Sequence, residues 1–420
     1  MSDSLIATRV QLSRQVAHWA TATASLGKLE DLASPAAWDG LERYLRVSVR
    51  QHLTAVIEQL TRRVRLLQAA FEAASSISEF EGVRRQLLAF RTQYLRAETT
   101  LDFYADAINS RTNPTVAGLL RACDTLAQRS MAQVLDQLGR KTPVVLTYID
   151  KGLGASILKA GLRLWDGTGE SPAAAIKIVR HNLQRPTALI HETGHQVAHI
   201  VDWNGELARA LEAALSEAPA GAAEVWASWA SEIAADAFAF VHTGYASVAA
   251  LHDVLAGDPR MVLRYVPGDP HPISYVRVLL GVEMCRQFYG AGPWDDLGQV
   301  WTRAYSSVSA ESSTAGLLRA SKPLLPAIAE VALRKPMRAF GGRALCALVD
   351  PARVSPQALE GMERQLGEAL YTSMHWIWTE AVRLLALTGF RAATSGLRVT
   401  DPLEQQQAWM LRLGGSMQAT

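Results

Sequence analysis

One short segment of the sequence combines residues that can bind a metal ion and activate water. Residues 191–195 read HETGH, so two histidines stand four positions apart and a glutamate follows the first. Side chains four positions apart share one face of an α-helix, so both imidazoles can reach a single Zn²⁺. Glu192 then faces the open side of the metal, where a general base is needed. The motif predicts a zinc site formed by His191 and His195, with Glu192 as the base.

A catalytic zinc ion normally takes three protein ligands and keeps one position for water, so a third ligand must lie elsewhere. His199 and Asp202 follow the motif closely, but the helix would have to reverse or break for either to reach the metal. Glu232 is the stronger candidate, because it lies in the apolar segment WASWASEIAADAFAF, where an unpaired buried carboxylate would be costly. Four other glutamates are expected on solvated helix faces: Glu206, Glu212, Glu217 and Glu224.

A second carboxylate on the same expected helix fits a supporting role. Asp236 follows Glu232 by four positions, which places both side chains on one helix face. A carboxylate there can accept the other ring N–H of a zinc-binding histidine and fix the orientation of that ring. One helix is therefore expected to supply both a metal ligand and its support.

The surrounding sequence predicts the elements that position these residues. Helical periodicity, with proline in a first turn, marks three segments: residues 186–202, 222–241 and 272–289. Before them, three segments rich in β-branched residues predict short strands: residues 144–150, 156–167 and 173–181. We expect an α+β, mainly α fold with a zincin-like catalytic core formed by a small sheet and the active-site helices.

The flanking regions read as helical. Residues 53–71 and 80–108 repeat apolar side chains at steps of three and four, which predicts a helical hairpin with matching seams. That hairpin either packs within its own domain or presents residues 35–110 to a protein partner. The expected domains are a helical domain at 1–141, the metallopeptidase core at 142–310 and an Ala/Leu-rich helical cap at 311–420.

Composition excludes several functional classes. The 420 residues are 49% hydrophobic and 20% charged, which is typical of a folded protein. Lys and Arg number 42 against 40 Asp and Glu, so the charge argues against nucleic-acid binding and a polybasic membrane anchor. The three cysteines are widely separated and odd in number, which fits a reducing compartment. Without a signal sequence or a long apolar stretch, we expect a soluble cytoplasmic protein.

Three ordered motifs carry a family resemblance. HETGH, then SEIAADAFA and then HPISYVR at residues 271–277 are similar to the gluzincin metallopeptidases. The nearest type is the HtpX-like and CAAX prenyl protease type, with an E-x-x-A-D-x-x-A second motif and an HPxxxxR element downstream. The resemblance covers roughly residues 173 to 285. Those relatives are usually embedded in a membrane, whereas this chain shows no transmembrane segment, so the resemblance implies only a soluble catalytic core.

The resemblance implies roles for individual residues. His191, His195 and Glu232 would bind one Zn²⁺, Glu192 would be the general base, and Asp236 would orient a ligand histidine. Residues 173–181 would form an edge strand along which an extended peptide pairs. The candidates to stabilise the oxyanion are His271, Tyr275 and Tyr245, with His271 favoured. Arg277 would pair with a carboxylate near the site or anchor substrate.

These observations predict a soluble zinc-dependent endopeptidase that acts on a protein or peptide. Zinc lowers the pKa of a bound water, the glutamate takes the proton, and the resulting hydroxide attacks the carbonyl. One alternative is a catalytically silent zinc-fold protein that binds a regulatory partner through the helical hairpin. Another is hydrolysis of a non-peptide amide. Glu192 favours an enzyme, since structural zinc needs no base.

Overall fold

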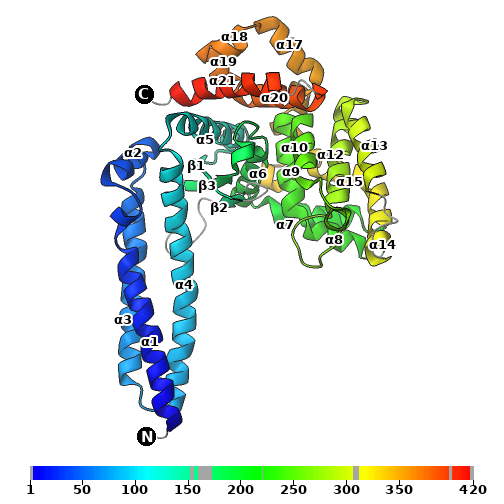
Figure 1. Cartoon of the computed structure of the whole chain (residues 1–420). Helices are drawn as coiled ribbons and strands as arrows, with labels where there is room; N and C mark the ends of the chain where they lie inside the picture. The colour runs from blue at the N-terminus through cyan, green and yellow to red at the C-terminus, as the bar shows by residue number, and fades with distance from the viewer. Residues whose placement is uncertain are drawn as a thin grey trace. The chain divides into compact units, whose positions relative to one another are not determined.

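A computed structural model of the chain describes residues 3–151, 156–158, 173–219, 221–305, 312–396 and 400–416. The protein is mainly helical with a small sheet, which confirms the expected α+β, mainly α class (Figure 1). Its contacts divide the chain into two compact units. The first comprises residues 1–112 and 160–175, and the second residues 113–159 and 176–420. The three-domain division at 141 and 310 stays a prediction.

The first unit contains long helices packed along one another. They are α1 (Asp3–Leu26), α2 (Pro35–Leu45), α3 (Val49–Ala73) and α4 (Ile77–Ser110). The predicted hairpin is confirmed as α3 and α4, and α1 packs against both of them. Ser76 caps α4, because its side chain accepts a hydrogen bond from the backbone N–H of Glu79. The side chain of Glu79 in turn accepts a hydrogen bond from the backbone N–H of Ser76.

The sheet has three strands, β1 (Val144–Ile149), β2 (Ser156–Leu158) and β3 (Ala173–Ile178). The three predicted strands are present, although residues 159–167 of the second lie outside the described part of the chain. The strand order is β1-β3-β2, so β3 is central and hydrogen-bonded on both sides. The expectation that residues 173–181 form an edge strand is therefore wrong, because β3 lies between two other strands.

The helices from the start of the second unit carry the predicted motifs. They are α5 (Pro114–Leu135), α6 (Ala188–Ile200), α7 (Trp203–Ala214), α8 (Ala222–Ser228), α9 (Ala230–Thr243), α10 (Tyr245–Leu255), α11 (Pro259–Val262), α12 (Ser274–Tyr289) and α13 (Pro293–Ala304). Helix α6 packs against α5 and α9, and α12 packs against α10 and α9. Helix α5, which follows Asn113 as its N-cap, belongs to this unit by its contacts.

The predicted helix over residues 222–241 is two helices, α8 and α9. The break lies at Trp229, whose φ of −92° and ψ of 6° leave the α-helical region. There the buried rings of Trp226 and Trp229 meet edge to face, with centroids 5.1 Å apart. The break places Glu232 in the first turn of α9, where the helix dipole favours a carboxylate.

Further helices complete the second unit. They are α14 (Ser312–Ser321), α15 (Leu325–Leu333), α16 (Leu345–Leu348), α17 (Pro356–Leu366), α18 (Ala369–Thr372), α19 (Met374–Thr379), α20 (Ala381–Thr394) and α21 (Thr400–Ser416). Helix α20 packs on α9 and α10, and α21 packs along α5. A Cβ on Gly414 would lie 1.9 Å from the carbonyl oxygen of Gly118, so only glycine allows α21 this close to α5. Within the described residues, no helix combines the length and apolar character needed to cross a membrane.

Candidate metal centre

The HETGH segment lies on α6, and the face of α6 opposite His191 and His195 is anchored in the core. Thr193 is fully buried, and its Oγ1 lies 3.0 Å from Oγ of Ser130 on α5. The same Oγ1 donates to the carbonyl oxygen of Ile190 at 2.8 Å. These bonds satisfy a polar side chain that would otherwise be costly to bury. They also fix the rotation of α6, so that His191 and His195 face α9.

A glycine in the motif allows α6 and α9 to touch. A Cβ on Gly194 would lie 2.8 Å from Cα of Ala235 and 2.9 Å from Cβ of Phe238, both on α9. No real Cβ approaches a backbone atom so closely, so any larger residue would force the helices apart. The contact brings the carboxylate of Glu232, one turn earlier on α9, to the two histidines of α6.

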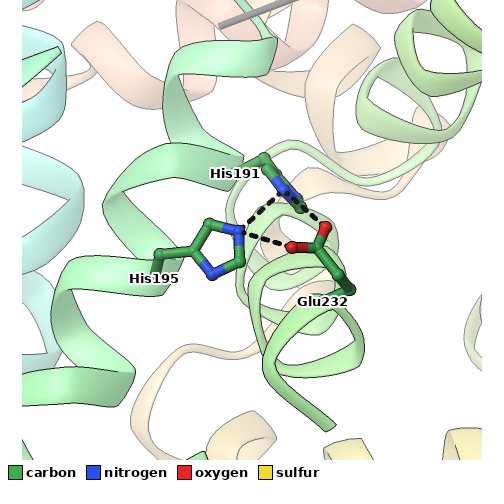
Figure 2. A group of neighbouring side chains, drawn as sticks. All are labelled: His191, His195 and Glu232. Carbon is green, nitrogen blue, oxygen red and sulfur yellow. Dashed lines mark hydrogen bonds and ion pairs between the residues drawn. The ribbon is translucent and has the colours of Figure 1, made fainter. Parts of the chain in front are cut away.

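His191, His195 and Glu232 converge in one compact group (Figure 2). The two Nε2 atoms of the histidines lie 3.1 Å apart. Glu232 places Oε2 3.4 Å from Nε2 of His191 and Oε1 3.2 Å from Nε2 of His195. A tetrahedral zinc ion bound at about 2.0 Å sets its ligand atoms about 3.3 Å apart. The three side chains are therefore spaced as ligands of a single metal ion and could hold one.

Two charged residues, Asp236 and Arg277, contact the members of this group and hold them in position. Asp236, one turn after Glu232, places Oδ1 2.8 Å from Nδ1 of His191, the ring nitrogen that does not face Glu232. Arg277 on α12 donates to both oxygens of Asp236, from Nε at 2.7 Å and from Nη2 at 2.9 Å. The same Nη2 lies 2.9 Å from Oε2 of Glu232. Arg277 thus pairs with carboxylates at the site, one of the two roles expected for it.

Burial and these pairings determine the charge states. Burial alone raises the pKa of Glu232 and Asp236, but the histidines and Arg277 outweigh it and hold both pKa values below their ordinary range. Burial lowers the pKa of Arg277, yet the two carboxylates raise it above its ordinary value. Burial likewise lowers the pKa of His191, and Asp236 and Glu232 raise it to about 10. Both carboxylates are ionised at neutral pH, as metal binding requires.

The second histidine has a support that the sequence analysis did not identify. Ser231 on α9 places Oγ 3.2 Å from Nδ1 of His195, and Asn204 on α7 donates to the same Oγ at 3.5 Å. Each histidine therefore has a polar partner on Nδ1 while Nε2 faces Glu232. Ser231 directly precedes Glu232, but a serine next to a glutamate is too common to signal such a role.

The site opens into a cavity of about 500 Å³. The three metal-binding candidates line this cavity together with Glu192, Asp236 and Arg277. Glu192 is 7% exposed, so it is a nearly buried carboxylate beside the three ligands. A cavity of this volume is in the range of small-molecule sites, so water and part of a substrate can reach the metal position.

His271 lies at the rim of the cavity, and its side chain is 60% exposed. Its Nε2 is 3.7 Å from Oε1 of Glu232, so this ring faces the metal group. On its other side, Asp269 accepts from the backbone N–H of His271 at 2.9 Å and lies 2.7 Å from Nδ1. The pairing with Asp269 was not predicted, and it orients Nε2 toward the site.

The other candidates lie elsewhere. Tyr275 and Tyr245 are buried, and neither lines the cavity beside the metal group. His199 and Asp202 are exposed and outside the group of potential ligands. Glu206 accepts from the backbone N–H groups of residues 338 and 339. The other glutamates, Glu212, Glu217 and Glu224, are all exposed, as expected of solvated helix faces.

Comparison with family models, with curated proteins and with solved structures finds no match. The assignment of a site therefore depends on its own geometry. Among the described residues, His191, His195 and Glu232 form a group able to hold a metal ion.

Proposed function

We propose that this protein is a zinc-dependent peptidase of the gluzincin kind. The observation that carries the proposal is the tetrahedral spacing of His191, His195 and Glu232 together with Glu192 in one cavity. Two histidines and a glutamate are a ligand set found in catalytic zinc sites, which leave the fourth position for water or substrate. A structural site would instead be closed by a fourth protein ligand and would have no use for a base.

The charge around the site favours a divalent cation. Glu192, Glu232 and Asp236 carry three negative charges in their ionised form, and Arg277 supplies one positive charge. Metal binding requires neutral histidines and displaces the proton that His191 carries in the metal-free protein, and the side chains then have a net charge of −2. Buried charges are stable only when they are paired or bound to a metal, and one Zn²⁺ would neutralise this excess.

The residues of the cavity suit the hydrolysis of an amide. A bound zinc ion would polarise the carbonyl and make water more acidic. Glu192 would take the proton from the attacking water and pass it to the leaving nitrogen. His271, held by Asp269, would donate from Nε2 to the developing oxyanion. Asp236 and Ser231 would keep the two histidine rings in place throughout.

A paired measurement of metal content and cleavage tests the proposal. The wild type, Glu192→Gln and Glu212→Gln are loaded with zinc, analysed for metal and incubated with a broad peptide library. Glu212 is exposed on α7 and provides the matched control. All three should bind one zinc ion per chain, and Glu192→Gln should lose activity by about 10²- to 10⁴-fold.

Two results would contradict the proposal. A wild type that binds one zinc ion and cleaves nothing, including non-peptide amides, would favour the zinc-fold regulatory protein. Zinc binding that survives Glu232→Ala with unchanged affinity would show that the third ligand is a different residue.

A further inference from the structure

The cavity beside the metal group changes character along its length. On α9 the lining residues are polar Ser231, Glu232 and Asp236 and then, toward the C-terminus of the helix, Ala239 and Phe240. The lining of α12 changes in the same direction, from Arg277 to apolar Leu280, Gly281 and Met284. Both helices thus change from charged to apolar residues with distance from the metal.

Helix α10 lines the cavity mainly with apolar side chains. Val248, Leu251, Val254 and Leu255 project into it from about two turns of α10. A Cβ on Gly281 would lie 2.9 Å from Cγ1 of Val248, so this glycine lets α10 and α12 close around the apolar end. Water confined among such side chains makes few hydrogen bonds, and an apolar group that replaces it gains free energy.

We propose that the apolar end is a specificity pocket for a large apolar side chain of the substrate, on the residue next to the bond that is cleaved. This inference depends on the proposed function, because the metal would hold the scissile carbonyl at the other end of the cavity. Among the described residues, the lining continues from the metal group along α9, α10 and α12, so a group of the substrate that extends there is buried against apolar side chains.

The dimensions favour a long group over a short one. Glu232 and Phe240 are eight residues apart on α9, which is about 12 Å along the axis, and Arg277 and Met284 span about 10 Å on α12. An alanine or valine side chain at the metal would leave most of this length empty. A long aliphatic or aromatic side chain fills it and buries more apolar surface.

Alkyl hydroxamates of increasing chain length test the pocket without requiring catalysis. The hydroxamate head binds zinc, and the chain measures the space beyond it. Calorimetry on the zinc-loaded protein should show affinity rising about fourfold per added methylene until the pocket is full. Equal affinity for acetohydroxamate and octanohydroxamate would overturn the inference.

Variants locate the effect. Ala250 and Leu251 line the cavity from α10 and are half-buried, so substitutions there disturb the fold little. Ala250→Leu should shorten the longest chain that still gains affinity, and Leu251→Ala should lengthen it. Ala393→Leu, at a half-buried alanine lining a different cavity, is the matched control and should not change the series. The same series for all four proteins would overturn the inference.

The measurements separate this inference from the proposed function. Zinc binding with a chain-length effect but no peptide cleavage would contradict the proposed peptidase activity and would still support the apolar pocket. Cleavage of the library with no preference for long aliphatic or aromatic residues beside the cleaved bond would contradict the proposed specificity pocket and would still support peptidase activity. Absence of zinc from the protein, seen before any hydroxamate is added, would contradict both.

Discussion

At the residue scale, the position of His191 depends on two carboxylates that contact different nitrogens of its ring. Glu232 faces Nε2 of the ring and Asp236 lies 2.8 Å from Nδ1, so the ring is held on both sides. Partners of this kind fix the tautomer and the direction of a ligand histidine. Arg277 in turn holds Asp236 through two hydrogen bonds. Metal affinity should therefore depend on a residue that does not touch the metal.

We expect Asp236→Asn to weaken zinc binding by about 10- to 100-fold without removing a ligand. Competition with a chelating dye would measure the dissociation constant. Asp202→Asn is the control, because Asp202 is exposed near the end of α6 and asparagine tolerates its φ of 55°. Equal zinc affinity in Asp236→Asn and the wild type would show that His191 needs no such support.

The pKa of His191 predicts how metal binding depends on pH. The neighbouring carboxylates raise this pKa to about 10 in the metal-free protein, so the ring is protonated at neutral pH. Zinc binds the neutral ring and must displace this proton. Zinc affinity should therefore rise about tenfold per pH unit from this group alone, until the pH approaches 10.

Titration calorimetry at pH 7 in buffers with different ionisation enthalpies would count the protons released. We expect His191→Gln to release one proton fewer than the wild type. The same number of protons from both proteins would show that His191 is neutral before the metal arrives.

The sequence was sufficient to predict the metal group but not all of its supports. The helical spacing of HETGH and the buried setting of Glu232 led to the three residues of the group that could hold a metal ion, because both follow from local sequence and from the cost of burying charge. Ser231 and the pairing of Asp269 with His271 depend on how neighbouring segments pack. Tyr275 was expected near the site, but it is buried away from the cavity, and helical spacing alone does not show this.

At the element scale, the close contact of α6 and α9 brings the candidate metal ligands together. Gly194 should not tolerate a methyl group, since its Cβ would meet backbone and Cβ atoms of α9 rather than the end of a flexible side chain. We expect Gly194→Ala to lower the free energy of unfolding by about 1–3 kcal/mol. It should also weaken zinc binding, because the helices that carry the ligands must separate.

Urea denaturation and zinc titration of the same sample would check both effects. Gly205→Ala in α7 is the matched control, because a Cβ there meets only Nη1 of Arg209 at 3.6 Å, an ordinary contact. Alanine is the better helix former, so this control should be neutral or slightly more stable. A Gly194→Ala protein with the stability and zinc affinity of the wild type would contradict the role given to the glycine.

The elements themselves show where sequence patterns stop being informative. The apolar periodicity of residues 222–241 continues through Trp229, so it predicted one helix where α8 and α9 are separate. The break depends on how two indole rings pack, which periodicity does not report. The strands of residues 144–149 and 173–178 were predicted from β-branched residues, but the central place of β3 depends on pairing between distant strands.

At the scale of the whole molecule, the candidate metal ligands all belong to the second unit. Within that unit, α6 is packed between α5 and α9, while α20 and α21 pack against α9 and α5. The metal would thus join two helices that are already part of one packed core. The first unit, with α1, α3 and α4, contributes none of the three ligands.

Zinc should therefore protect one unit and leave the other unchanged. Zinc at 100 times its dissociation constant adds about 2.7 kcal/mol to the stability of the state that binds it. In hydrogen exchange followed by mass spectrometry, amides of α6 and α9 should exchange more slowly after zinc is added, while those of α1, α3 and α4 keep their rates. His195→Ala should lose this protection, and His199→Ala, altered at an exposed position of the same helix, should keep it. Protection that spreads over α3 and α4 would contradict a metal effect confined to the second unit and would indicate that the two units respond to zinc as one.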